Sequence, residues 1–275
     1  MDIICIGKLV KTQSIFQGII SMASEERFGY EWKKYSTILP DYEGQFQNWI
    51  SPLKPEDLQG YDILDAGCGM GRNSYFALKY GAKSVMGIDN DERSVSVAKE
   101  NLTEFDNATI NLKSIYELDY KNKFDIIFSI GVIHHLKYPE LAIKKLVGAL
   151  RPRGTILIWV YSYEGNEWIQ NIITPIRRVI TSKLPISLLH YITYILSIPF
   201  FLCLKLFKSE HPYYKQISKF SLGHLHSIIF DQLLPEIAHY WTKEEAYSLF
   251  KKNNLRAVSI HKPPNEMGWT MIGRK

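Results

Sequence analysis

The segment Ile63–Arg72, with the sequence ILDAGCGMGR, constrains the fold more than any other part of this chain. An apolar run ends in an acidic residue, three glycines follow at alternate positions, and a helix-forming run begins at Asn73. This order predicts a buried parallel strand that turns tightly into a helix, with bare backbone at the turn. Backbone N–H groups at such a turn can contact a ligand without a side chain in the way, so we expect a cofactor site here.

A second acidic residue lies at the spacing that a nucleotide site requires. Ser84–Asp89 is another apolar run that ends in an acid, and Asp89 follows the glycines by about 20 residues. A carboxylate at that distance accepts hydrogen bonds from ribose hydroxyls in doubly wound folds. Taken alone, Asp89 fits the N-cap of the next helix equally well. The two segments together favour a ligand site, because independent levels of the sequence agree.

The glycine spacing separates the nucleotide cofactors from one another. The dinucleotide fingerprint is G-x-G-x-x-G, whereas the third glycine here, Gly71, comes one residue early. Asp65 precedes the first glycine by two residues, and its carboxylate would repel a pyrophosphate. The same charge suits a ligand that carries an ammonium and a sulfonium. A nicotinamide dehydrogenase is therefore not expected.

These residues resemble motif I of the class I S-adenosylmethionine (SAM)-dependent methyltransferases. Phe124–Leu136 is similar to the fourth strand of this family and the loop beyond it, and Leu150–Ile158 to the turn into its fifth strand. The resemblance covers about residues 60–162 and returns near 240–275. It implies an α/β, Rossmann-like fold with a seven-stranded, mostly parallel sheet and an antiparallel strand in the final hairpin.

Local patterns along the chain agree with such a sheet. They predict strands near 61–66, 84–89, 108–113, 124–130, 154–161, 255–262 and 268–273, and helices near 72–81, 91–105, 138–150 and after a capping box at Thr242. Most of residues 1–50 are expected to be helical. We divide the chain into an N-terminal helical or lid segment at 1–55, a SAM-binding core at 56–162 and 232–275, and a helical insert at 163–231.

The insert contains a long apolar stretch. Residues 184–204 include no Asp, Glu, Lys or Arg, and their length suffices for a membrane span. Pro185 and Pro199 interrupt the stretch, and both ends of the insert return to one domain, which argues against a single crossing. Three interpretations stay open: a substrate lid, a homodimer contact, or an element in peripheral contact with a membrane.

The resemblance also implies a set of SAM-binding residues. The glycine loop would surround the methionine part, Asp65 would lie near its ammonium, and Asp89 would bind the ribose. Ser114 and Ile115 occupy the position that contacts the adenine in the family. The full set of implied cofactor-binding residues is Asp65, Gly67, Cys68, Gly69, Gly71, Asp89, Asn90, Ser114, Ile115, Ile130 and Gly131.

Methyl transfer to a hydroxyl or an acidic carbon needs a base. His134 and His135 follow the fourth strand and are the candidate catalytic residues, because imidazole titrates in the required range. A structural role for this pair stays open as the alternative. Tyr30, Trp32 and Tyr35 either close over the sulfonium through cation–π contacts or form a hydrophobic plug.

Composition limits the partners and the compartment. The formal charge of +5 comes from scattered Lys and Arg, and no Asn-Pro-Pro-Tyr-type tetrapeptide follows the fourth strand, so nucleic acid is not an expected partner. Cys5, Cys68 and Cys203 are widely spaced, which predicts neither a metal site nor a disulfide framework. The chain begins without a secretion signal, and we expect a cytoplasmic location, with peripheral membrane contact through 184–204 left open.

The expected activity is transfer of the SAM methyl group to an O, N or C atom of a small-molecule or lipid-like acceptor, such as a lipid or glycan precursor. S-adenosyl-L-homocysteine is then the second product. Two alternatives remain, namely a SAM-using enzyme with another outcome and a SAM-binding protein without catalysis.

Overall fold

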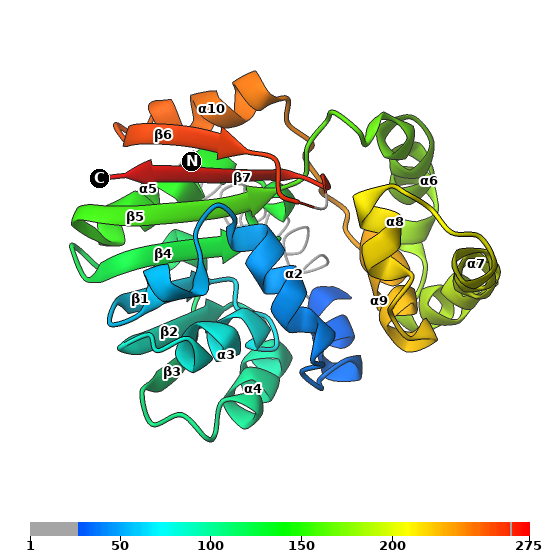
Figure 1. Cartoon of the computed structure of the whole chain (residues 1–275), viewed down its shortest axis with the longest axis horizontal. Helices are drawn as coiled ribbons and strands as arrows, with labels where there is room; N and C mark the ends of the chain where they lie inside the picture. Colours follow the sequence, from blue (N-terminus) through cyan, green and yellow to red (C-terminus); the bar gives the residue numbers. More distant parts are fainter. Residues whose placement is uncertain (1–26, 265) are drawn as a thin grey trace, which may run out of the picture.

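The structure, a computed structural model, describes residues 27–264 and 266–275. A seven-stranded sheet forms its centre (Figure 1). The strands are β1 (Asp62–Ala66), β2 (Ser84–Asp89), β3 (Ala108–Leu112), β4 (Phe124–Ile130), β5 (Leu150–Val160), β6 (Arg256–His261) and β7 (Trp269–Arg274). Their order is β3-β2-β1-β4-β5-β7-β6; β1 to β5 are parallel, and β7 is antiparallel to both of its neighbours. The predicted Rossmann-like fold with an antiparallel final hairpin strand is confirmed.

Helices cover the sheet, and further helices lie beyond the carboxyl ends of its parallel strands. Residues 27–34 are helical, and the further helices are α2 (Asp41–Ile50), α3 (Arg72–Lys79), α4 (Glu92–Asn101), α5 (Pro139–Ala149), α6 (Thr174–Val179), α7 (Ile186–Leu206), α8 (Pro212–Ile217), α9 (Leu222–Leu233) and α10 (Lys243–Lys251). Short 3₁₀ or π turns lie at Pro55–Leu58, Ile115–Glu117, Ile133–His135, Ile169–Ile173 and Thr181–Lys183. The part of the helical prediction at residues 1–26 lies outside the described residues.

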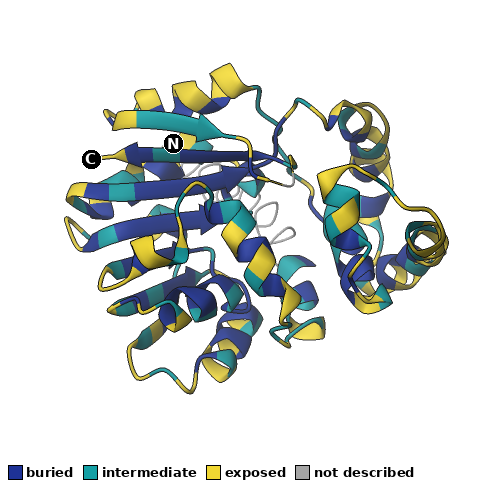
Figure 2. Cartoon of the chain, in the orientation of Figure 1, coloured by how far each residue is buried: buried dark blue, intermediate teal, exposed yellow. Residues whose placement is uncertain are grey.

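The central strands β1 and β4 are mostly apolar because both faces of the sheet are buried there (Figure 2). In β4, Ile126 and Phe128 pack with side chains of α2, α3 and α4, whereas Ile127 packs with side chains of α5 and α10. These two apolar clusters hold the sheet between its helix layers. They fix the carboxyl ends of the parallel strands, where open α/β sheets bind their ligands.

Some element boundaries differ from those predicted. β5 begins at Leu150 rather than near 154, because Leu150 already pairs with Phe124 of β4 before the bulge in that pairing. α4 ends at Asn101, earlier than the predicted 105, where the chain turns and the N–H of Phe105 donates to the carbonyl of Leu102. The capping box at Thr242 is present and opens α10, as predicted.

Helices α6 to α9 lie beyond the carboxyl ends of the parallel strands, on the side of the sheet away from the C-terminus (Figure 1). α7 is a single helix of 21 residues that contains Pro199. We expected this proline to interrupt the apolar stretch, and it does not. The carbonyl that Pro199 leaves without an N–H donor belongs to Ile195, a residue that is 70% exposed. By length and composition alone α7 is able to cross a membrane, with a mean hydropathy of 1.8 over its most apolar window.

Candidate active site

A cavity of about 1150 Å³ opens at the carboxyl ends of β1, β2, β4 and β5. The donor half of the cavity is the part bordered by Gly67, Asp89, Asn90, Ser114, Ile115, Ile130 and Gly131. The acceptor half is the part bordered by Phe28, Glu31, Trp49, His135, Trp159, Tyr161, Asp231 and Gln232. The volume exceeds that of a typical single-ligand pocket, so the cavity has room for two ligands side by side.

The glycine loop forms the turn after β1 with the bare backbone that its sequence predicts. Gly67, Gly69 and Gly71 all have positive φ values, at 83°, 53° and 83°. A Cβ atom on Gly67 would lie 2.4 Å from Cγ2 of Val132, and one on Gly69 would lie 3.0 Å from Nε1 of Trp32. The loop therefore accepts no side chain at its first glycine, where it borders the cavity.

Asp89 borders the donor half with both carboxylate oxygens held by backbone groups. The N–H of Gly69 donates to Oδ2 at 2.9 Å, and the N–H of Asp91 donates to Oδ1 at 3.0 Å. Burial raises the pKa of Asp89 to about 6, against the lowering effect of these hydrogen bonds. The group is therefore mainly ionised at pH 7.

Asp65 lies behind the loop and does not border the cavity. Its side chain is fully buried, the hydroxyl of Ser74 donates to Oδ2 at 2.7 Å, and Oδ1 has no hydrogen-bond partner among the described residues. Burial raises the pKa of Asp65 to about 7. Of the implied SAM-binding residues, Gly67, Asp89, Asn90, Ser114, Ile115, Ile130 and Gly131 border the cavity, whereas Asp65, Cys68, Gly69 and Gly71 lie behind its wall.

The two candidate histidines differ in position. His134 is fully buried outside the cavity wall, with its ring centroid 3.9 Å from that of Tyr161, and burial holds its pKa well below the usual range. His135 borders the cavity, and its Nδ1 lies 2.8 Å from the carbonyl oxygen of Ile237. Because a carbonyl only accepts, Nδ1 carries the proton. Burial lowers the pKa of His135 to about 3, so both rings are neutral at pH 7.

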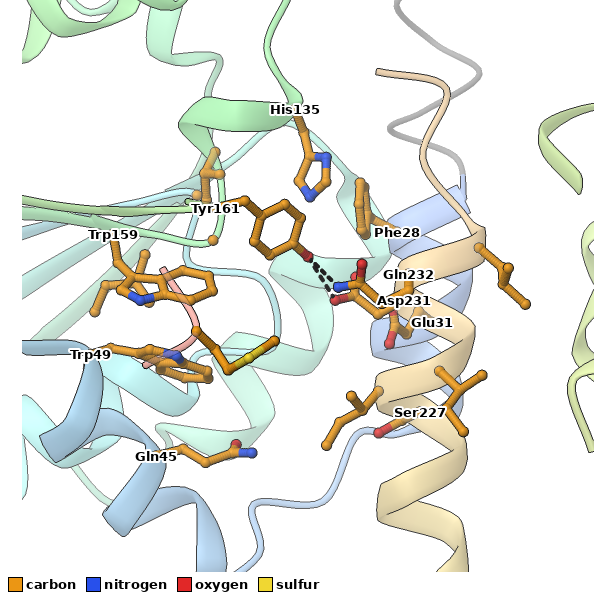
Figure 3. Close-up of a pocket in the computed structure, with 18 of the residues that line it drawn as sticks. Phe28, Glu31, Gln45, Trp49, His135, Trp159, Tyr161, Ser227, Asp231 and Gln232 are labelled. Atoms are coloured by element: carbon orange, nitrogen blue, oxygen red, sulfur yellow. Dashed lines mark hydrogen bonds between the residues drawn. The ribbon is translucent and has the colours of Figure 1, made fainter. Parts of the chain in front are cut away.

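Sequence reasoning missed the polar groups of the acceptor half. Glu31 comes from the helix at 27–34, Asp231 and Gln232 come from α9, and Tyr161 follows β5. The Tyr161 hydroxyl donates to Oδ2 of Asp231 at 3.5 Å and accepts from Nε2 of Gln232 at 2.8 Å (Figure 3). One signal was available: Asp231 is the only acidic residue in the otherwise apolar and neutral sequence of α9.

Glu31 is the most deeply buried of these groups. Glu31 is only 2% exposed, yet it borders the cavity. Its Oε2 has no hydrogen-bond partner among the described residues. Burial raises the pKa of Glu31 well above its usual value, and the negative charge of Asp231 raises it further. Burial also raises the pKa of Asp231, to about 6.

Aromatic rings form much of the remaining wall. Trp49 and Trp159 lie with their ring centroids 5.7 Å apart, and Phe28 lies near His135 (Figure 3). The guanidinium of Arg72 lies over the rings of Trp32, Tyr42 and Trp49, at 5.1, 5.0 and 4.9 Å from their centroids. Trp32 thus packs against the guanidinium of Arg72 and lies beside Gly69.

Comparisons with known proteins show which family the chain belongs to. A family model described as a methyltransferase domain matches residues 57–254, which is most of the chain. Among curated proteins, a tRNA U34 carboxymethyltransferase of Campylobacter hominis is 34% identical over 152 residues, which cover 50% of this chain and 51% of that protein. The enzyme of the same name from Idiomarina loihiensis is 31% identical over 118 residues, which cover 41% and 36%. The chain thus spans about half or less of the length of these relatives.

Solved structures share the fold at low sequence identity. A magnesium protoporphyrin IX methyltransferase from Synechocystis PCC 6803 with bound S-adenosylhomocysteine superposes with a TM-score of 0.56 at 12% identity, covering 96% of this chain and 99% of that one. An O-methyltransferase-like structure from Nostoc punctiforme PCC 73102 gives a TM-score of 0.54 at 16% identity, covering 89% and 60%. At these identities the likeness shows the fold alone.

One expectation from the sequence is wrong. We did not expect nucleic acid as a partner and expected a small-molecule or lipid-like acceptor, yet the curated relatives are named for a tRNA substrate. The lysines are scattered along the sequence, which we took as evidence against nucleic acid. The fold nevertheless brings Lys113, Lys137 and Lys262 to the border of one cavity. The missing tetrapeptide excludes only one way of gripping a base. The peripheral membrane contact and the homodimer contact that accompanied this expectation gain no support from the comparisons.

Proposed function

Because the chain belongs to the methyltransferase-domain family, with SAM as its methyl donor, we propose that its acceptor is a base of a transfer RNA. The aromatic and acidic acceptor half of the cavity carries this proposal, together with the names of the relatives. An unpaired base has flat faces that stack on aromatic rings and polar edges that pair with carboxyl and amide groups. Both kinds of group border the acceptor half.

The residues that border the donor half support SAM as its ligand. In this proposal Asp89 accepts hydrogen bonds from the ribose hydroxyls, and the backbone of Gly67 and Gly131 borders the methionine part. The backbone of Ile115 contacts the adenine, while Asp65 acts from behind the loop through its charge. SAM supplies an electrophilic methyl group bound to a sulfonium. The protein has to hold the acceptor atom in line behind that methyl group and to exclude water.

The acceptor half is proposed to hold the base between aromatic rings. Stacking of a base on an aromatic side chain contributes about 1–3 kcal/mol. Trp49, Trp159 and Phe28 border the interior, and Trp168, which is 54% exposed, borders the opening. Lys137 and Lys262 are exposed on the same border, where they are placed to bind phosphates of the RNA chain.

Transfer of tritium from [methyl-³H]SAM to total bacterial tRNA tests the proposal. We expect label in acid-precipitated RNA that ribonuclease treatment releases and that Asp89→Ala abolishes. Affinity for the RNA should fall as salt rises from 50 to 200 mM, because phosphate contacts release counterions. Label that enters only a ribonuclease-resistant, low-molecular-weight fraction of a cell extract would contradict the RNA acceptor.

A further inference from the structure

We propose that Glu31 and Asp231 form a proton-sharing carboxyl pair that accepts the proton of the acceptor during methyl transfer. The inference deepens the proposed function and rests on it in one respect: the acceptor atom must carry a proton that it loses. No motif in the sequence marks this pair. Its members come from the helix at 27–34 and from α9, about 200 residues apart in the chain.

The first support is an unsatisfied polar atom that faces the cavity. Oε2 of Glu31 has no hydrogen-bond partner among the described residues, although Glu31 is only 2% exposed and borders the cavity. A buried oxygen without a partner destabilises the structure that holds it. A ligand that supplies a donor or acceptor at this point would relieve that destabilisation, so the atom points to a bound group in the acceptor half.

The second support is the mutual position of the two carboxyl groups. Figure 3 shows Glu31 and Asp231 beside each other on the same wall of the cavity, with Asp231 directed toward Tyr161. The charge of Asp231 acts on Glu31, as its raised pKa records. Two carboxyl groups in a low-dielectric site do not both ionise easily, so the pair retains one proton near neutral pH. The ionised member accepts a proton while the neutral member donates a hydrogen bond.

Two cations and several tyrosine hydroxyls face the pair. The cations that face it are Arg72, which favours ionisation of both carboxyl groups, and Arg177, which favours ionisation of Asp231. Neither arginine forms an ion pair of 4.0 Å or less with Glu31 or Asp231 in the described structure. The other titratable groups that face the pair are the hydroxyls of Tyr35, Tyr42, Tyr161, Tyr213 and Tyr240.

Asp231 is the member positioned to take the proton. Tyr161 donates to its Oδ2, Gln232 donates to Tyr161, and Tyr240 donates to Oε1 of Gln232 at 3.4 Å. These hydrogen bonds connect the carboxylate of Asp231 to Tyr161, Gln232 and Tyr240. His135, which borders the same cavity, is a weak base in comparison because burial lowers its pKa to about 3.

The proton and electron balance of the step is complete without another reagent. The lone pair of the acceptor atom forms the new bond to the methyl carbon, and the carbon–sulfur bond breaks with its electron pair on sulfur. The proton of the acceptor atom passes to the carboxylate, which then holds it as a carboxylic acid until water removes it. General-base catalysis of this kind contributes about 10²- to 10⁴-fold to the rate.

Carbon-13 NMR of the carboxyl groups tests the pair without any acceptor. In the full-length chain we expect two carboxyl titrations that are coupled and displaced toward neutral pH. Asp231→Asn and Glu31→Gln should each remove one and leave the other uncoupled. Asp106→Asn, at an exposed turn, is the matched control and should change neither. If both carboxyl groups of the wild type ionise below pH 5, the inference is overturned, whatever the acceptor is.

Kinetics with [methyl-³H]SAM and tRNA then test the role. Asp231→Asn should lower kcat by at least about 100-fold, while calorimetry shows SAM affinity within about twofold of wild type. Glu31→Gln imitates the neutral carboxyl group, and it should keep more activity than Asp231→Asn and retain the acid limb of the pH profile. An Asp231→Asn enzyme with near-wild-type kcat would overturn the inference. Coupled titrations without label in tRNA would instead refute the RNA acceptor and leave the pair intact.

Discussion

The two halves of the cavity are built in different ways. Residues of the donor half lie at the ends of consecutive parallel strands, and backbone groups satisfy its central carboxylate, Asp89. Residues of the acceptor half come from segments far apart in the chain, and its Glu31 keeps an oxygen without a partner among the described residues. The donor half is therefore preorganised by local backbone, whereas the acceptor half depends on tertiary packing and leaves one polar group for a ligand to satisfy.

The difference suggests how each half responds to mutation. Changes behind or within the glycine loop act on stability and on SAM affinity, because the loop is part of the core of the sheet. Changes in the acceptor half act on the rate of transfer and leave the fold in place. The following tests are ordered from the largest expected effect to the smallest.

Asp65→Asn should change the pH dependence of stability most. The folded pKa of Asp65, about 7, lies above its unfolded value, so the folded state binds more protons between the two. The contribution of Asp65 to the free energy of unfolding is fully present below about pH 4. It is lost as the pH rises through 7, and the loss is on the order of 4 kcal/mol. Asn keeps an acceptor for Ser74 and should remove this loss. Urea unfolding from pH 4 to 8 measures it, and an unchanged slope would show that Asp65 is not buried as described.

Gly67→Ala should nearly abolish SAM binding. Its φ of 83° costs an alanine about 1–2 kcal/mol, and the new Cβ would meet Val132 at 2.4 Å. We expect at least a 100-fold loss of affinity by calorimetry, or about 3 kcal/mol. Gly148→Ala, in α5 with no atom within 4 Å of the new Cβ, is the matched control and should leave affinity unchanged. If Gly67→Ala and Gly148→Ala bound SAM with equal affinity, the glycine loop would not be part of the SAM site.

Asp89→Asn should weaken SAM binding less than the glycine change. An asparagine presents an NH₂ group to one of two backbone N–H donors, those of Gly69 and Asp91, and loses the charge. Hydrogen bonds to charged groups contribute about 1.5–3 kcal/mol, which corresponds to roughly a 10- to 100-fold loss of affinity. Calorimetry against Asp106→Asn measures the effect. Wild-type affinity in Asp89→Asn would remove this carboxylate from the proposed ribose contact.

The same division explains what could be predicted from the sequence. The positions of the strands along the chain, the turn after β1 and the placement of Asp89 follow from local patterns, since each depends on neighbours within a few residues. The seven-stranded sheet itself was implied by the family resemblance. Glu31 and Asp231 carry no such pattern, because only the packing of α9 against the helix at 27–34 brings them to one cavity. The expectation that nucleic acid is not a partner was wrong for the same reason. A count of lysines scattered along the sequence does not show which of them the fold brings to the cavity.

His135→Gln is expected to have the smallest effect and sharpens the contrast within the acceptor half. The ring is already neutral, and Nδ1 donates to the carbonyl of Ile237, a bond that an amide NH₂ group is able to replace. We expect a loss in kcat below about tenfold, compared with at least about 100-fold for Asp231→Asn. The acid limb of the pH profile should stay in place, because it reports the carboxyl pair. If His135→Gln instead removes that limb and lowers kcat by about 100-fold, the imidazole is the base and the carboxyl pair serves only to bind the acceptor.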